Sequence, residues 1–193
     1  MTTEFGLVLL AAGRGTRFGP TPKLLSPLDG EPLVRHVGRA ALASRLGPVV
    51  AVLGAHGPAV RASLDGLGVT CVDNPAHGDG LSTSLRAGLA ALPTADAVLV
   101  LLGDMPRIGP HHLIALADAF RKGESAAVVP VHGGQRGNPV LLDRRRLETD
   151  LARLTGDQGA GRLLARRSDI HEVVMDVAVL QDVDTPDALA ALA

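Results

Sequence analysis

The chain has 193 residues, of which 19 are basic and 20 are acidic, so its formal net charge is −1. This length fits one domain, and the balanced charge argues against a broad binding surface for nucleic acid or for an anionic membrane. No run of residues has the length of a transmembrane helix or the pattern of a signal peptide, and the single cysteine excludes an internal disulfide. We therefore expect a cytoplasmic protein in which any anion site is a local concentration of Arg and Lys.

Stretches typical of strands and of helices alternate along the whole chain, which predicts an α/β fold with a mainly parallel sheet in one domain, residues 1–193. The most apolar stretch, residues 97–102, is expected at the centre of the sheet, and residues 131–164 are expected to form a lobe over one face. Strands are expected at 5–10, 49–53, 69–72, 97–102, 126–131, 139–142 and 170–175. Helices are expected at 31–44, 58–64, 82–92, 110–120, 143–154, 159–167 and 186–192.

The first predicted strand leads into a loop, residues 9–23, that is rich in glycine, proline and positive charge. Glycines allow backbone N–H groups to approach phosphate oxygens, and Arg14, Arg17 and Lys23 supply the charge. A dinucleotide fingerprint fails here because its third glycine would fall on Phe18, and the Gly-Lys-Ser/Thr of a Walker A loop is absent. A tight turn with surface basic residues is the alternative, but three basic residues on one short loop favour a polyanion site.

Acidic residues follow two later strands, at the ends where ligands bind in open α/β sheets. Asp104 comes just after the central strand, and Asp182 and Asp184 follow the last one. Carboxylates there can hold Mg²⁺ against phosphate oxygens while Lys and Arg neutralise developing charge, as phosphoryl or nucleotidyl transfer requires. Taken singly, each Asp could equally be a helix cap or a turn residue. Together with the basic loop, the three favour a metal site.

The start of the helix at 82–92 offers N–H donors to a base edge or a phosphate, although Ser82 and its neighbours could simply be caps. The chain has no Trp or Tyr and only three Phe, so backbone groups and small side chains would have to hold any base. The seven histidines show no ligand spacing, and His111 and His112 are expected at the surface.

These segments resemble the MobA-like nucleotidyltransferases and, more closely, the molybdenum cofactor cytidylyltransferases. The resemblance covers nearly the full chain in order, through six motifs. They are residues 10–25 (with LAAGRGTRFG and KLL), 80–89 (GLSTSLRAGL), 103–106 (GDMP), 136–140 (RGNPV), 156–160 (GDQGA) and 182–186 (DVDTP).

The resemblance implies a Rossmann-like three-layer sandwich and a Mg²⁺-dependent transfer of a nucleoside monophosphate from an NTP to a phosphorylated acceptor, with release of pyrophosphate. The implied acceptor is molybdopterin, and Arg17, Lys23 and Asp104 are the implied catalytic residues. Residues implied at the base are Leu10, Ala11, Ala12, Gly13, Gly80, Leu81 and Ser82, and those at the triphosphate are Gly15, Arg17 and Lys23. Asp104 and Asp184 are implied as metal ligands, and Arg136, Asn138 and Asp157 as acceptor contacts.

Three alternatives stay open. Ala12 stands where guanylyl-transferring members of the family have a second glycine, which favours CTP, but a relative using GTP, or a sugar-phosphate or isoprenoid-precursor acceptor, is one alternative. A second is an oxidoreductase with a nicotinamide or flavin cofactor, which is disfavoured because no acid follows the second strand to bind a ribose. The third is a catalytically silent nucleotide-binding partner of a molybdoenzyme maturation factor.

Overall fold

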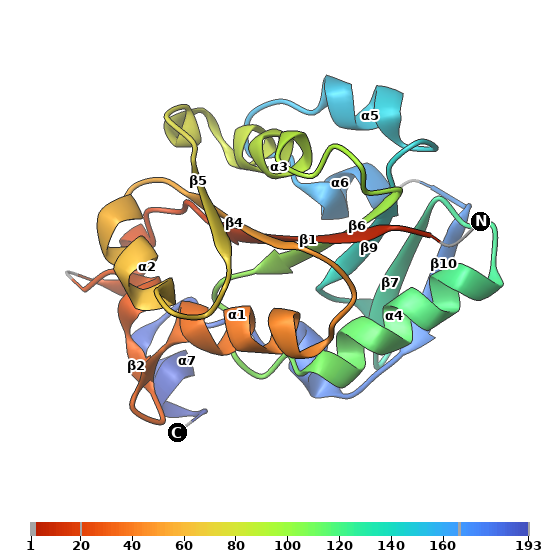
Figure 1. Ribbon diagram of the computed structural model, residues 1–193. Coiled ribbons are helices and arrows are strands. Elements are labelled where there is room, and N and C mark those ends of the chain that lie inside the picture. The colour runs from red at the N-terminus through yellow and green to blue at the C-terminus, as the bar shows by residue number, and fades with distance from the viewer. Residues whose placement is uncertain (1–2, 20, 166, 193) are drawn as a thin grey trace.

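The computed structural model describes residues 3–19, 21–165 and 167–192, without the side chain of Arg17. A sheet forms the middle of three layers (Figure 1), with its strands in the order β10-β7-β9-β6-β1-β4-β5 and with β8 paired to β7. The strands of this sheet are β1 (Phe5–Ala11), β4 (Val49–Leu53), β5 (Thr70–Asp73), β6 (Ala97–Leu102), β7 (Ala127–His132), β8 (Gln135–Arg136), β9 (Val140–Asp143) and β10 (Ile170–Val174). A separate small ribbon pairs β2 (Pro27–Leu28) with β3 (Glu31–Pro32).

The centre of the sheet is parallel. Strand β1 pairs in parallel with β4 on one side and with β6 on the other, so that Leu10 lies opposite both Val52 and Leu102. Strand β6 occupies the middle of the seven-strand order, as its apolar sequence predicts. Strand β9 runs antiparallel to both β6 and β7. The carboxyl ends of β1, β4 and β6 therefore meet at one edge of the sheet, which is where an open α/β fold binds its ligand.

Helices cover both faces of the sheet (Figure 1). One face carries α1 (Leu33–Ala43), α2 (Gly57–Leu64) and α4 (Pro110–Lys122), and the other carries α3 (Leu81–Ala90), α5 (Glu148–Arg153) and α6 (Ala160–Leu164). The remaining elements are α7 (Pro186–Ala190) and four short 3₁₀ turns, η1 (Thr16–Phe18), η2 (Lys23–Leu25), η3 (His77–Asp79) and η4 (Val177–Leu180).

Two apolar cores fill the spaces between the layers. Because side chains alternate along a strand, Leu7 and Leu9 of β1 enter the core under α1, α2 and α4, which we call the main core. Val8 and Leu10 enter the second core, under α3, α5 and α6. The predicted three-layer α/β domain with a mostly parallel sheet is confirmed. Among the described residues no helix is both long and apolar enough to cross a membrane.

Several expected boundaries are wrong for local reasons. The first helix begins at Leu33 rather than at residue 31, because Glu31 and Pro32 pair with β2. The helix expected from Asp143 begins only at Glu148, because Asp143 ends β9 and its carboxylate accepts the N–H of Arg146. Residues 131–164 do not form a separate lobe. They contribute β9 to the sheet interior and two helices to the layer that contains α3.

Candidate active site

The loop after β1 is shaped by one glycine and held by one phenylalanine. Gly15 has φ of 60°, in the left-handed region, and a Cβ built there would lie 3.0 Å from the Cβ of Lys23. Phe18 is buried in a small cluster with Leu28, Leu33 and Val183, which anchors the loop beside the C-terminal segment. Because Gly15 has no side chain, the loop can close tightly over Lys23.

Lys23 joins two acids from different segments. Asp104 directly follows β6, as expected, whereas Asp184 lies beyond η4 and not at the end of β10. Its ammonium lies 2.5 Å from Oδ2 of Asp104 and 2.9 Å from Oδ1 of Asp184. The side chains of Lys23, Asp104 and Asp184 are 13%, 18% and 35% exposed. The backbone N–H of Val183 donates to the carbonyl of Asp104 at 2.9 Å, which holds the two acidic segments side by side. Three segments that are far apart in the sequence therefore converge on one point.

The electrostatics of this group keep the lysine charged. Burial disfavours the ammonium form, but the carboxylates of Asp104 and Asp184 outweigh that effect and raise the pKa of Lys23 above its ordinary value of 10.5. The second oxygen of Asp104, Oδ1, is buried and has no hydrogen-bond partner among the described residues. Buried carboxylate oxygens are normally paired, so this atom is suited to receive a further cation.

A cavity of about 510 Å³ opens beside Lys23 and Asp104, which is within the range of small-ligand sites. It is lined by Leu10, Ala12, Gly13, Arg14, Gly15, Thr16, Lys23, Leu24, His77, Gly78, Gly80, Leu81, Ser84, Leu102, Gly103, Asp104 and Asp157. A smaller cavity of about 160 Å³ is lined by Gly15, Thr16, Lys23 and Asp184. Lys23 thus borders both spaces, between the glycine loop and the acids.

The far wall of the larger cavity is built where α3 begins. Gly80 has φ of 107°, and a Cβ there would lie 2.2 Å from the carbonyl carbon of Gly156. The N–H of Ser82 donates to the oxygen of Gly156 at 3.0 Å. This close contact between the start of α3 and the turn at Gly156 places Asp157 at the cavity.

Most of the residues expected at the nucleotide line the larger cavity. These are Leu10, Ala12, Gly13, Gly15, Lys23, Gly80 and Leu81. The side chain of Ala11 enters the main core instead, because it alternates with Leu10 and Ala12 along the strand. Ser82 is fully buried, and its hydroxyl has no hydrogen-bond partner in the part of the chain that the structure describes. Both residues support the wall of the cavity without lining it. The side chain of Arg17 lies outside the described residues.

The residues expected at the acceptor are not all brought together. Asp157 lines the cavity, but Arg136 and Asn138 do not. Arg136 donates from Nε to Glu172 at 2.7 Å and from Nη1 to the carbonyl of Leu164 at 3.2 Å. The backbone N–H of Asn138 donates to the carbonyl of Val179 at 2.9 Å. The guanidinium of Arg136 is therefore bonded to β10 and to α6 and does not line the cavity.

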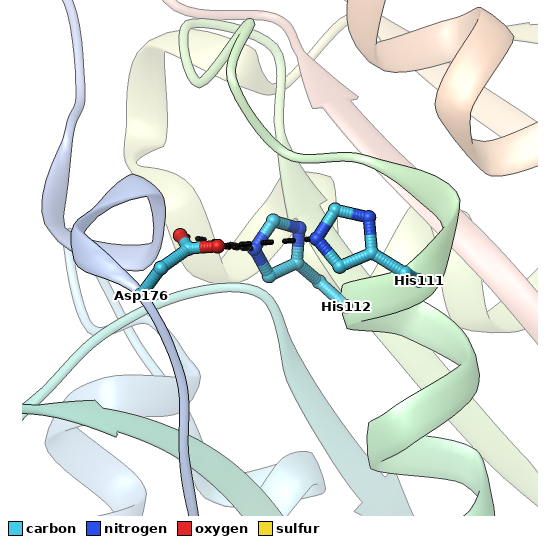
Figure 2. A group of neighbouring side chains, drawn as sticks. All are labelled: His111, His112 and Asp176. Carbon is cyan, nitrogen blue, oxygen red and sulfur yellow. Dashed lines mark hydrogen bonds and ion pairs between the residues drawn. The ribbon is translucent and has the colours of Figure 1, made fainter.

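Two histidines differ from what the sequence suggests. His77 lines the cavity, and its Nδ1 is buried without a hydrogen-bond partner among the described residues. It comes four residues after the end of β5, beyond the strand-end positions at which ligand-binding residues are expected. His112 was expected at the surface, but its side chain is only 3% exposed, because its ring is enclosed between the start of α4 and Asp176 (Figure 2). The prediction for His111 is confirmed, since its side chain is 70% exposed.

The cavity lies above the carboxyl edge of a parallel sheet, beside a glycine loop, a charged lysine and two acids. These features define the class as an α/β protein with its ligand cavity at the carboxyl ends of the strands. Residues 7–172 match the family described as the MobA-like NTP transferase domain. The chain belongs to this family and thus to the nucleotidyltransferase superfamily.

Individual relatives extend over the same length. Nicotine blue oxidoreductase of Paenarthrobacter nicotinovorans is 32% identical over 194 residues, which cover 96% of this chain and 94% of that protein. The crystal structure of Rv0371c from Mycobacterium tuberculosis H37Rv is 32% identical and has a TM-score of 0.84, over 100% of this chain and 98% of the other. The complex of Rv0371c with manganese has a TM-score of 0.80 at 30% identity, over 98% of each chain.

Proposed function

We propose that the protein transfers CMP from CTP to a phosphorylated acceptor, with molybdopterin as the candidate acceptor, in a Mg²⁺-dependent reaction that releases pyrophosphate. The observation that carries this proposal is the position of Lys23, between Asp104 and Asp184 and at the border of two adjoining cavities. Lys23, Gly15 and Thr16 line both cavities, while Asp104 lines the larger one and Asp184 the smaller one, so positive charge, a glycine loop and two carboxylates lie within reach of one another. Nucleotidyl transfer needs these groups together.

The acids fit a divalent cation. Asp104 offers a buried oxygen without a partner among the described residues, and Asp184 reaches the same lysine from another segment. Hard oxygen ligands of this kind suit Mg²⁺ and Mn²⁺, and the manganese complex of Rv0371c supports a divalent metal in this family. Asp104 and Asp184 would hold the ion, which when bound would neutralise phosphate charge. Asp182 is exposed and lines neither cavity, so it is not included as a ligand.

The chain's own residues would then bind and orient the reactants. The glycine loop would receive the triphosphate on its backbone N–H groups, and Lys23 would neutralise charge that develops on the phosphates. The terminal phosphate of the acceptor is anionic at neutral pH and would attack the α-phosphorus in line, forming one P–O bond as the bond to pyrophosphate breaks. No general base is required, so positioning and charge neutralisation supply the catalysis.

The preference for CTP rests on Ala12. Ala12 lines the larger cavity, and the resemblance to the family implies glycine at this place in guanylyl-transferring members. A methyl group there would narrow the base site and favour a pyrimidine over guanine. Leu10 and Leu81 line the same cavity and offer apolar surface to the base in place of aromatic stacking.

The test is to incubate the protein with each of the four NTPs, Mg²⁺ and a molybdopterin acceptor, and to follow pyrophosphate. We expect release with CTP that depends on the acceptor and is lost when the metal is chelated or when Asp104 is changed to Asn. Asp118→Asn, at an exposed position on α4, is the matched control and should retain activity. Pyrophosphate release with GTP and with none of the other three NTPs would refute the preference for CTP. Nucleotide binding without turnover under all conditions would refute the enzyme and support a silent partner of a molybdoenzyme maturation factor.

A second candidate function is favoured by one observation, the similarity to nicotine blue oxidoreductase over 96% of the chain. An oxidoreductase of this kind would hold a nicotinamide or flavin cofactor in the same cavity. The strand-end position that would bind a ribose lacks an acid, since β4 is followed by Gly54, Ala55 and His56. Tight binding of NADPH or of a flavin without divalent metal, with no pyrophosphate release from any NTP, would establish this function in place of the transferase.

A further inference from the structure

His112 connects the first turn of α4 to the first turn of η4 through the two nitrogens of one ring. Its Nδ1 accepts the backbone N–H of Gly109 at 2.9 Å, which caps α4. Its Nε2 lies 3.2 Å from each carboxylate oxygen of Asp176, the N-cap residue of η4. Figure 2 shows the carboxylate of Asp176 facing this ring, with His111 beyond it.

The pattern of donors sets the tautomer of His112. Because Nδ1 accepts a hydrogen bond from an N–H group, the neutral ring carries its proton on Nε2, where it donates to Asp176. His111, His112 and Asp176 have the composition of a cation site, since one ligand atom from each lies within 4.8 Å of the others. A metal-bound histidine, however, donates its other ring N–H, and Gly109 offers His112 no acceptor. The cluster is therefore a hydrogen-bonded clamp.

Asp176 is itself firmly placed. One of its oxygens accepts the N–H of Ala178 at 2.9 Å. That backbone N–H and, after it, His112 lower the pKa of Asp176 below its ordinary value, so the carboxylate is charged at neutral pH. The ring of His111 lies against that of His112, with centroids 3.9 Å apart and planes tilted by 37°. Its Nε2 is 3.9 Å from Asp176 and makes no hydrogen bond at that distance.

The segment that starts at Asp176 ends at the proposed metal centre. Ala178 and Val179 of η4 are buried in the main core, and Val183 donates its N–H to the carbonyl of Asp104. Asp184 follows directly and reaches Lys23. On the other side, the cap on Gly109 is five residues after Asp104. The ring of His112 thus bonds to the segment that leads from Asp104 to α4 and to the segment that leads from β10 to Asp184.

We propose that His112 is a positioning residue for the acidic pair: it fixes Asp176, and through Asp176 it holds the segment 176–184 in the place that brings Asp184 to Asp104. The effect on metal binding rests on the proposed function, whereas the effect on the segment itself does not. Partners behind metal ligands typically contribute about 10–100-fold to metal affinity. We expect the lower end of that range, because Val179 and Val183 anchor the same segment independently.

Two substitutions test the two hydrogen bonds of the His112 ring separately. His112→Asn keeps an acceptor in the place of Nδ1 and so keeps the cap on α4, but it has no donor that reaches Asp176. His112→Gln keeps a donor near the place of Nε2 and gives up the cap. Asp176→Ala removes the clamp from the other side, and His111→Ala is the matched control, because it leaves both bonds of His112 intact.

Two measurements are made on the full chain. Hydrogen exchange of the Val183 amide reports on the segment without any metal, and Mn²⁺ affinity, with Asp104→Asn as the reference for loss of the site, reports on the acidic pair. We expect His112→Asn and Asp176→Ala to accelerate the exchange and weaken Mn²⁺ binding, each roughly tenfold. His112→Gln and His111→Ala should stay within about twofold of the wild type in both measurements.

The proposal is overturned if the Val183 amide of His112→Asn exchanges at the wild-type rate. It is also overturned if only His112→Gln exchanges faster than the wild type, because the effect then belongs to the cap on α4. If exchange responds as expected while Mn²⁺ affinity does not change, the clamp does not reach the acidic pair and the positioning role fails. The proposed metal centre fails if the wild type does not bind Mn²⁺, or if Asp104→Asn binds it as tightly as the wild type. The exchange result then still shows whether His112 holds the segment.

Discussion

The ammonium of Lys23 lies 2.5 Å from the carboxylate of Asp104, although 81 positions separate the two residues in the chain. The contact follows from the sheet, because β1 and β6 pair in parallel with Leu10 opposite Leu102. Each strand ends at the same edge, and the loop that follows each one carries a member of the pair. Asp184 then reaches the same ammonium from the C-terminal segment.

Changing Lys23 to Met should remove activity and leave the fold in place. The variant keeps the length of the side chain but leaves the two carboxylates without their shared cation. We expect kcat for pyrophosphate release to fall on the order of 10²-fold or more. Lys122→Met is the matched control, since it alters the other lysine of the chain, at the exposed end of α4. Near-normal turnover in Lys23→Met would contradict the role of the ammonium.

Changing Asp104 to Asn should cost catalysis far more than stability. The amide can still accept a hydrogen bond from Lys23, so we expect the free energy of unfolding to fall by no more than about 2 kcal/mol. Loss of one carboxylate should weaken Mn²⁺ binding and lower kcat on the order of 10²-fold. Urea denaturation and a metal titration, each compared with Asp118→Asn, check the two parts separately. If Asp104→Asn loses much more stability than this and binds Mn²⁺ as tightly as the wild type, Asp104 serves the fold and not the metal site.

Gly15→Ala tests the shape of the loop. Alanine at a φ of 60° is strained, by about 1–2 kcal/mol, and its Cβ would press on the Cβ of Lys23. Gly66→Ala is a matched control, because Gly66 has φ of 77° and open space around its Cβ position. We expect similar losses of thermal stability in both variants, but a rise in KM for the NTP, about tenfold, in Gly15→Ala alone. Equal KM values in the two variants would argue against the loop as the triphosphate site.

Ala12→Gly should widen the base site. We expect the ratio of kcat/KM for CTP to that for GTP to fall roughly tenfold, the effect of one methyl group in a pocket. Ala11→Gly is the control, because the side chain of Ala11 enters the main core, so this change should lower stability and leave the ratio unaltered. A ratio that responds equally to both changes would show that the loop backbone, rather than the methyl group, selects the base.

The charge of Asp176 should contribute to stability only above acid pH. The N–H of Ala178 and the ring of His112 lower its pKa below the ordinary value of 3.8, and His111 is the other titratable group that faces it. A lowered pKa stabilises the fold above the unfolded value and ceases to do so as pH falls through the folded one. The wild type should therefore be more stable than Asp176→Asn in urea at about pH 5, and the difference should shrink at about pH 2.5. If the stability difference between the wild type and Asp176→Asn grows as the pH falls, the pKa of Asp176 is not lowered and the two hydrogen bonds do not stabilise its charged form.

The sequence alone predicts the alternation of elements, the central place of residues 97–102 and the loop and acids that follow particular strands. These features are local, since apolar runs, glycines and strand-end polar residues can be recognised without knowing their neighbours. It does not predict the antiparallel course of β9 or the burial of His112. Both depend on pairing between residues far apart in the chain, β9 with β6 and β7, and His112 with Asp176.

What the amino-acid order determined by itself was therefore the set of parts at the site: a glycine-rich basic loop, two acidic segments and an α/β framework to carry them. Only the tertiary structure decided which of these meet. It placed Lys23 between Asp104 and Asp184, turned Ala11 into the core and tied Arg136 to Glu172. The reason is that strand order and register, set by long-range packing, determine which loops share an edge, and no local pattern encodes that.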